Sequence, residues 1–505
     1  MRTAARTAFL MAVLTLVSKF IGFIRELLLA NYYGTGYIID AYVMAIAIPG
    51  IIFGGIFAAI STAYMPIFSR KMEIDGEIQA NRFTSEITNL ALAVSILAGL
   101  VGIIFSGQIV SIFASGFEGE TAALTSFYIK ITFFYVMFSS ALSLMETYLQ
   151  YKGVFLPQVI AGYAQNAVII SIIIISAYTT HYILVLGWLF GYAIRMGIML
   201  LRAKKKGFTY TPTLKVKGAA RDIVLLAIPV FVGSSMNQIN MFIDKTLASG
   251  LPQGSIAALN YGGTIITMIS GLTISILVTI CYPKLAQASS LNESNRFSNI
   301  LSTGINLIAI IAIPCSLGAM AFSNQIVQII YERGAFDAAA TAFTSSAFLF
   351  YAVGMFFSST TSLLNQAYYS LHNMKSPMIF AAVGVIINVV FNLILIRFMA
   401  HNGLALATSI SAICTAIFMF LGFRKKYPDL KIVKSKLKLI LIVFSAVISV
   451  TVSWLFYCLV GNAVLMPKTI LFVLTVTSAG IVYLLMLIIF KIEEVNLLKQ
   501  IIIKR

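Results

Sequence analysis

The stretch AFLMAVLTLVSKFIGFIRELLL, residues 8–29, decides the fold class of this chain. A helix needs about 20 mostly apolar residues to cross the hydrocarbon core of a membrane, and this run is long enough. Arg2 and Arg6 precede it, as in a signal peptide, but no small-residue cleavage site follows it. We therefore expect a first transmembrane helix that is retained in the mature protein.

The rest of the chain repeats this pattern of apolar runs separated by short polar segments. The composition agrees, because 60% of the residues are hydrophobic and only 10% are charged, against roughly 25% charged in soluble domains. The sequence predicts an all-α polytopic membrane protein with about fourteen transmembrane helices. The expected spans are 8–29, 41–64, 86–106, 124–149, 155–177, 182–201, 223–248, 257–280, 300–322, 340–366, 377–399, 403–423, 437–459 and 468–490.

The positive charges indicate how these spans are oriented. With the N-terminus inside, 27 of the 35 Lys and Arg residues fall in segments predicted to be inside, and five lie at the outer ends of spans. Such an excess is typical of cytoplasmic segments, so we expect both termini in the cytoplasm. The net charge of +18 sits in these short segments, where it meets anionic lipid headgroups. We therefore expect membrane lipids rather than nucleic acid as partners.

An internal repeat with a spacing near 220 residues divides the chain. Pro66 and Asn81-Arg82-Phe83 match Pro283 and Asn295-Arg296-Phe297, and the matches continue in order along both halves. An even number of helices in each repeat predicts two six-helix lobes related by a pseudo-two-fold axis along the membrane normal, an architecture suited to alternating access. The expected domains are 1–206, 207–426 and 427–505, the last holding two additional helices and a basic tail.

Several motifs resemble the lipid II flippases of the MurJ (MviN) family. They are Ser18-Lys19-Phe20-Ile21-Gly22-Phe23-Ile24-Arg25-Glu26, Tyr33-Gly34-Thr35-Gly36, Gly254-Ser255-Ile256-Ala257-Ala258-Leu259-Asn260-Tyr261, Arg333-Gly334-Ala335-Phe336-Asp337 and Tyr368-Tyr369-Ser370-Leu371-His372-Asn373. The resemblance covers about 400 residues. It implies the fourteen-helix fold of the multidrug/oligosaccharidyl-lipid/polysaccharide exporters.

The resemblance also implies a function, which is to flip a polyprenyl-pyrophosphate-linked peptidoglycan precursor to the outer leaflet. The pyrophosphate and sugars would occupy a polar site while the polyprenyl tail stays in lipid. The alternatives are a flippase for another lipid-linked oligosaccharide, such as a capsule unit, and a cation-coupled drug exporter. The sequence has no HExxH, GxxxxGK[ST] or GxSxG motif, so an enzyme is not expected.

Charged residues inside the first span are the main candidates for substrate binding. A charge near the middle of a membrane helix costs roughly 3 kcal/mol on insertion scales, so Lys19 and Arg25 are expected to face a cavity or a partner. We interpret them as a cationic pocket for pyrophosphate, oriented by Glu26 and Asp40. The alternative is a structural Arg25–Asp40 pair with Lys19 reaching to the membrane surface.

Other polar residues within spans are weaker candidates. Lys130 lies inside the span 124–149, and Glu146 lies nearer its inner end, so either is a candidate to line the cavity. Arg195 is close enough to the inner surface to reach it. The family resemblance adds Asn260 to the expected substrate-binding residues.

A set of oxygen ligands in the second half predicts a cation site. Asn388 and Asn392 are four residues apart and share a helix face. The predicted topology places Asp244 and Thr408 at a similar depth. A carboxylate, two amides and a hydroxyl suit a small hard cation, so sodium is the expected coupling ion and no other cofactor is expected. The alternative is that Asp244 and Lys245 are neighbours at the membrane interface and that the two asparagines form hydrogen bonds between helices.

Overall fold

The computed structural model describes residues 2–213, 219–433, 435–463 and 467–495, and these residues form helices without a strand. The last ten residues of the predicted basic tail lie outside this description. Helices are the expected form, because a backbone inside a membrane must satisfy its own hydrogen bonds. The helices belong to two compact units: Met1–Ala257 with Arg333–Asp337, and Ala258–Glu332 with Ala338–Arg505. The predicted three-part division stays a prediction.

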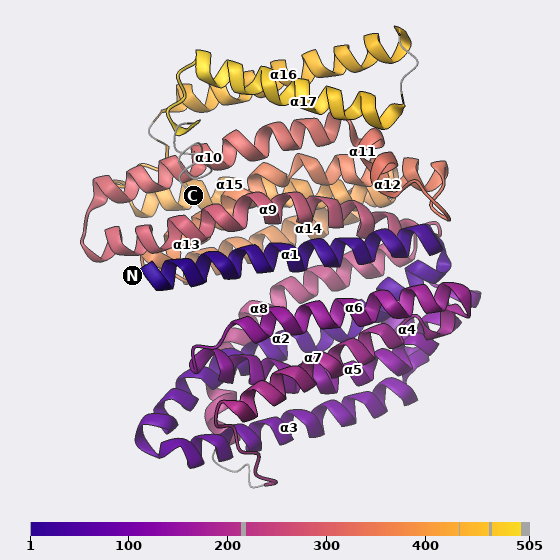
Figure 1. Ribbon diagram of the computed structural model, residues 1–505, viewed down its shortest axis with the longest axis vertical. Coiled ribbons are helices and arrows are strands. Elements are labelled where there is room, and N and C mark those ends of the chain that lie inside the picture. Colours follow the sequence, from indigo (N-terminus) through magenta and orange to yellow (C-terminus); the bar gives the residue numbers. More distant parts are fainter. Residues whose placement is uncertain (1, 214–218, 434, 464–466, 496–505) are drawn as a thin grey trace. The chain divides into compact units, whose positions relative to one another are not determined.

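The first unit is built around α2, which packs against α5 and α8, while α7 packs against α5 and α6. Figure 1 shows these helices in indigo to magenta. Their bounds are α1 (Arg2–Tyr33), α2 (Tyr37–Ile74), α3 (Gly76–Ile104), α4 (Ser106–Phe113), α5 (Gly119–Tyr151), α6 (Leu156–Tyr178), η1 (His181–Ile183), α7 (Leu186–Lys205) and α8 (Ala219–Ser249).

The second unit contains the remaining helices, except that the first three residues of α9 belong to the first unit. Within it α14 packs on α15, and α16 lies beside α17 (Figure 1). The bounds are α9 (Ser255–Ser290), α10 (Ser294–Ala321), α11 (Ser323–Tyr331), α12 (Ala338–Val353), α13 (Met355–Ser370), α14 (Lys375–Met399), α15 (His401–Lys426), α16 (Lys436–Ala463) and α17 (Lys468–Ile489).

All fourteen predicted spans coincide with helices. Among the described residues, ten helices are long and apolar enough to cross a membrane, and an eleventh span is the pair α12 and α13, bent by 44°. The three other predicted spans lie on α1, α8 and α9. The chain is thus an all-helical, multi-pass membrane protein. The sequence reasoning missed the short helices α4 and α11, which it had treated as loops, and the bend at Gly354.

The predicted repeat has a counterpart in the packing of each unit. In the first unit, Phe83 and Tyr148 are buried in one hydrophobic cluster. In the second, Phe297, the repeat partner of Phe83, and Tyr368, which lies 220 residues after Tyr148, are also buried in one cluster. The short helices α4 and α11 each follow a long helix after a one-residue break, at Phe105 and Phe322. The sequence matches therefore mark equivalent core positions of the two units.

Two glycines allow the end of α1 to pack closely against the segment 333–337 within the first unit. The N–H of Ala335 donates to the carbonyl of Asn31 at 2.8 Å. Gly34 has a φ of +60°, and a Cβ added there would collide with the carbonyl oxygen of Ala335. Gly334 has a φ of +59°, and its added Cβ would collide with the carbonyl of Asn31. Because both positions need a positive φ and close backbone approach, only glycine fits them.

Replacing Gly34 by alanine is therefore expected to destabilise the protein by more than about 1 kcal/mol, through backbone strain and the clash with Ala335. Gly36 is the matched control, because it has a φ of −135° and nothing lies within 4 Å of its added Cβ. Thermal unfolding of the purified protein in detergent measures both variants. A G34A midpoint equal to that of G36A would contradict this account.

Candidate functional site

Arg25 is the centre of a polar cluster inside the first unit. Its guanidinium donates to Glu26 Oε1 at 2.7 Å and to Asn166 Oδ1 on α6 at 3.3 Å. It also lies over the ring of Trp188 on α7, 5.1 Å from the centroid, a cation–π geometry. The side chains of Arg25 and Glu26 are 19% and 12% exposed, so the charged pair is shielded yet still reachable. An anion that approaches would find a desolvated, oriented guanidinium.

Glycines on α7 explain how these helices come so close. Gly187 and Gly191 are four residues apart, and Cβ atoms added there would lie 3.2 Å from Ile169 Cα and from Gln165 Cγ of α6. Small residues at this spacing let membrane helices approach closely. The close approach brings Gln165 of α6 against α7, the helix that carries Trp188. Trp188 in turn donates its Nε1–H to the hydroxyl of Tyr42 at 2.8 Å.

Asp40 has a different role from the one expected. It is buried, and its carboxylate accepts hydrogen bonds from the N–H groups of Gly254 at 2.6 Å and Ala257 at 2.8 Å. Ala257 is in the first turn of α9, so Asp40 satisfies backbone donors that a helix start leaves open. In the described structure it is Glu26, and not Asp40, that orients Arg25. The sequence could not show this contact, because its partners are backbone groups more than 200 residues away.

The other predicted substrate-binding residues come from three different helices. Lys19 is exposed on α1, and Lys130 is exposed on α5. Asn260 is half-buried on α9 in the second unit, and its carbonyl accepts a hydrogen bond from Thr264 Oγ1 at 2.8 Å. Their participation in substrate binding stays a prediction.

Three of the four predicted cation ligands lie together in the second unit. Asn392 Nδ2 donates to Asn388 Oδ1 at 2.8 Å, and Asn388 Nδ2 donates to Thr408 Oγ1 on α15 at 3.4 Å. Both asparagines are buried. Asp244 belongs to α8 of the first unit, where its carboxylate accepts a hydrogen bond from Asn240 at 3.2 Å. The hydrogen bond between helices that the alternative interpretation predicted is thus present.

A second arginine–carboxylate pair was missed. Arg195 lies in the middle of α7, and its guanidinium donates to Glu146 Oε1 on α5 at 2.7 Å and to Gln165 Oε1 at 2.8 Å. The sequence reasoning had considered only that Arg195 reaches the inner surface, and it did not predict this pair. The available signal was Glu146, the one acidic residue in the span 124–149, because a buried cation in a membrane helix requires a counter-charge.

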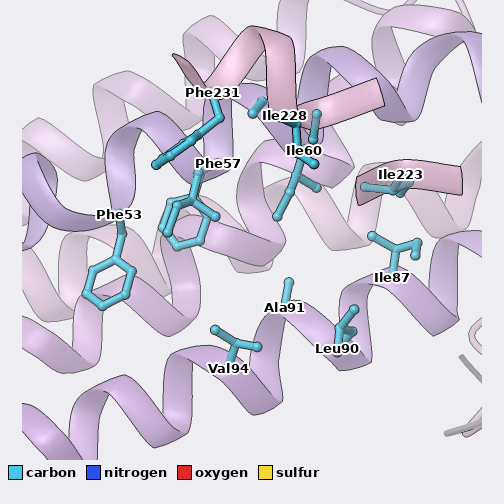
Figure 2. Close-up of a pocket in the computed structure, with 13 residues that line it drawn as sticks. Phe53, Phe57, Ile60, Ile87, Leu90, Ala91, Val94, Ile223, Ile228 and Phe231 are labelled. Atoms are coloured by element: carbon cyan, nitrogen blue, oxygen red, sulfur yellow. The ribbon is translucent and has the colours of Figure 1, made fainter. Parts of the chain in front are cut away.

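An apolar pocket of about 400 Å³ lies in the same unit, between α2, α3 and α8. Figure 2 shows Phe53, Phe57 and Phe231 on one side and Leu90 and Val94 on the other. Every residue that lines it is apolar. It has no donor for a pyrophosphate or a sugar, so the polar chemistry of this unit is concentrated around Arg25 and Arg195.

Comparisons with known proteins agree with this architecture. The family described as "Lipid II flippase MurJ" matches residues 29–492. A Rhizobium tropici protein named "Probable lipid II flippase MurJ" is 27% identical over 430 residues, covering 82% of this chain and 79% of the relative.

Solved structures show the same fold. One described as "Lipid II flippase MurJ, inward closed conformation" superimposes with a TM-score of 0.84 at 23% identity, covering 96% of this chain and 100% of the other. A multidrug resistance MATE family transporter of the MOP superfamily gives 0.67 at 13% identity, covering 83% and 96%. Because the family match spans nearly the whole chain, the protein belongs to the lipid II flippase MurJ family.

Proposed function

We propose that this protein flips lipid II, the polyprenyl-pyrophosphate-linked peptidoglycan precursor, from the inner to the outer leaflet of the bacterial cytoplasmic membrane. The observation that carries the proposal is Arg25, a shielded cation within a membrane helix, held by Glu26, Asn166 and Trp188. Membership of the flippase family supports it.

The chemistry of the cluster fits the head of such a lipid. Pyrophosphate is an anion that must leave water to cross the membrane, and a guanidinium offers it paired, charge-assisted hydrogen bonds. The polyprenyl tail needs no polar site, because it remains in the hydrocarbon. Translocation makes and breaks no covalent bond, so alternating exposure of a polar site is sufficient and catalytic residues are not required. The excess of positive charge in the predicted inner segments supports cytoplasmic termini.

We further propose sodium as the coupling ion. Asn388, Asn392 and Thr408 supply neutral oxygens within hydrogen-bond reach of one another. Amide oxygens become available to a cation when the side chains turn away from their mutual hydrogen bonds. Asp244 of the first unit is the acidic residue that the sequence analysis assigns to sodium, and a bound cation would lower the cost of holding that carboxylate within the membrane.

Depletion of the protein in its own bacterium tests the proposed function. Lipid II is expected to accumulate in the inner leaflet, because its synthesis continues while its export stops. The measurement is mass spectrometry of lipid-linked precursors, combined with an impermeant label that reports the leaflet. Accumulation of a different lipid-linked oligosaccharide would identify that lipid, instead of lipid II, as the substrate. If no lipid-linked precursor accumulates, the proposal is contradicted.

Arg25→Ala is expected to abolish lipid II translocation in reconstituted vesicles while the protein still inserts, because removing the charge lowers the insertion cost. Arg25→Lys keeps the charge but loses the planar fork, so we expect a loss of about tenfold. Lys19→Ala is expected to be inactive as well. Lys152→Gln is the control, since Lys152 pairs with the exposed Glu77 at an inner helix end. Wild-type translocation by R25A and K19A would refute a pyrophosphate pocket at these residues.

The sodium proposal predicts that translocation rises with sodium concentration and that Asp244→Asn removes this dependence. The comparison is between sodium and a large organic cation, at matched ionic strength and membrane potential. Asn240→Ala is the informative neighbour, because it removes the hydrogen bond to Asp244 without removing the carboxylate, and it should retain the dependence. Equal rates of the wild-type protein in the two salts would rule out sodium coupling.

A further inference from the structure

Arg195 has hydrogen-bonding capacity that its partners do not use. A guanidinium carries five N–H donors, and two of its nitrogens bind Glu146 and Gln165. In the described part of the chain, its buried Nε–H has no hydrogen-bond partner. The side chains of Arg195 and Glu146 remain 23% and 16% exposed. The pair is therefore open on one side, as a binding site requires.

Arg195 and Arg25 belong to one continuous polar surface of the first unit. The neighbouring residues Gln165 and Asn166 of α6 accept hydrogen bonds from Arg195 and Arg25, respectively. On α7, Tyr192 comes between Trp188 and Arg195, and its ring stacks on that of Trp188 with centroids 6.0 Å apart.

Helix geometry gives the spacing of Trp188 and Arg195 along α7. Trp188, Tyr192 and Arg195 are spaced by four and three residues, so they share one side of α7. Trp188 contacts Arg25, and seven residues of helix rise place Arg195 about 10 Å farther along α7, toward the end that carries Arg202, Lys204 and Lys205. The predicted topology puts that end inside, so a lipid head coming from the inner leaflet meets Arg195 before Arg25.

We propose that Arg195 is a second pyrophosphate-binding residue, and that Glu146 occupies its guanidinium until the lipid-linked phosphate replaces the carboxylate. This inference rests on the proposed function and extends it. Phosphate oxygens match the fork of a guanidinium as well as a carboxylate does. Glu146 has another partner to retain after the exchange, because Gln158 Nε2 donates to its second oxygen at 3.3 Å.

The protein has a built-in reporter for this exchange. It contains two tryptophans, Trp188 and Trp454, and Trp454 is exposed on α16. In a W454F background, tryptophan fluorescence therefore comes from Trp188 alone, about 10 Å along α7 from Arg195. The probe is geranyl pyrophosphate, added to the full-length protein in phosphatidylcholine nanodiscs. A saturable fluorescence change measures the affinity.

Substitutions of Arg195 and of Glu146 are expected to shift the affinity for geranyl pyrophosphate in opposite directions. Arg195→Gln should weaken binding by about tenfold, equivalent to one charge-assisted hydrogen bond. Glu146→Gln should strengthen it, because the competing carboxylate is gone. The matched controls are Arg82→Gln and Glu86→Gln, which break a comparable pair (3.4 Å) near the start of α3 and should change nothing.

If the Arg195–Glu146 ion pair only stabilises the fold, a different result is expected. Both R195Q and E146Q would then lower thermal stability and leave the affinity unchanged, and this outcome would overturn the proposal even if R195Q alone failed to fold. Equal affinity for inorganic pyrophosphate would assign the site to free anions rather than to a lipid, and would also overturn it. Lipid II translocation by the wild-type protein is measured separately, so the failure of the flippase function and the failure of the Arg195 site are distinguishable.

Discussion

The structure of the first unit depends on one constraint, which is that a charge within the membrane must be compensated. Uncompensated burial of an arginine in a membrane helix costs roughly 3 kcal/mol or more. Arg25 and Arg195 both meet this requirement, through Glu26 and Glu146 at 2.7 Å. The helices α1, α5, α6 and α7 therefore pack with polar residues facing one another, and that polar surface is the feature a purely apolar bundle would lack.

The adjacent apolar pocket is consistent with the same constraint, because it contains no charge that needs compensation. Its lining from α2, α3 and α8 is entirely apolar, and Figure 2 shows aromatic and aliphatic side chains turned toward it. Exposed hydrophobic side chains carry no penalty in lipid, so such a surface can stay open. The unit thus separates two environments: a polar one around Arg25 and Arg195, and an apolar one suited to hydrocarbon.

Sequence reasoning located the helices and Arg25, because both depend on local signals: long apolar runs, and a charge inside one of them. It did not locate the partners of these charges. Asp40 binds backbone groups at Gly254 and Ala257, and Arg195 binds a carboxylate 49 residues away. Contacts of this kind depend on which helix faces which, and the repeat and the hydropathy pattern leave that open. The short helices α4 and α11 were missed because nine residues or fewer cannot span a membrane.

The two arginine pairs differ in what their separation would do to the fold. Arg25 and Glu26 are adjacent on α1, so their ion pair does not itself join two helices. Arg195 on α7 and Glu146 on α5 come from different helices that pack together, so replacing Glu146 removes a polar tie between them. Ligand exchange at Arg195 is therefore coupled to the packing of α5 and α7, whereas the Arg25–Glu26 ion pair lies within one helix. A ligand shifts a conformational equilibrium only through contacts that differ between the two states, and a contact that replaces the tie between α5 and α7 is of that kind.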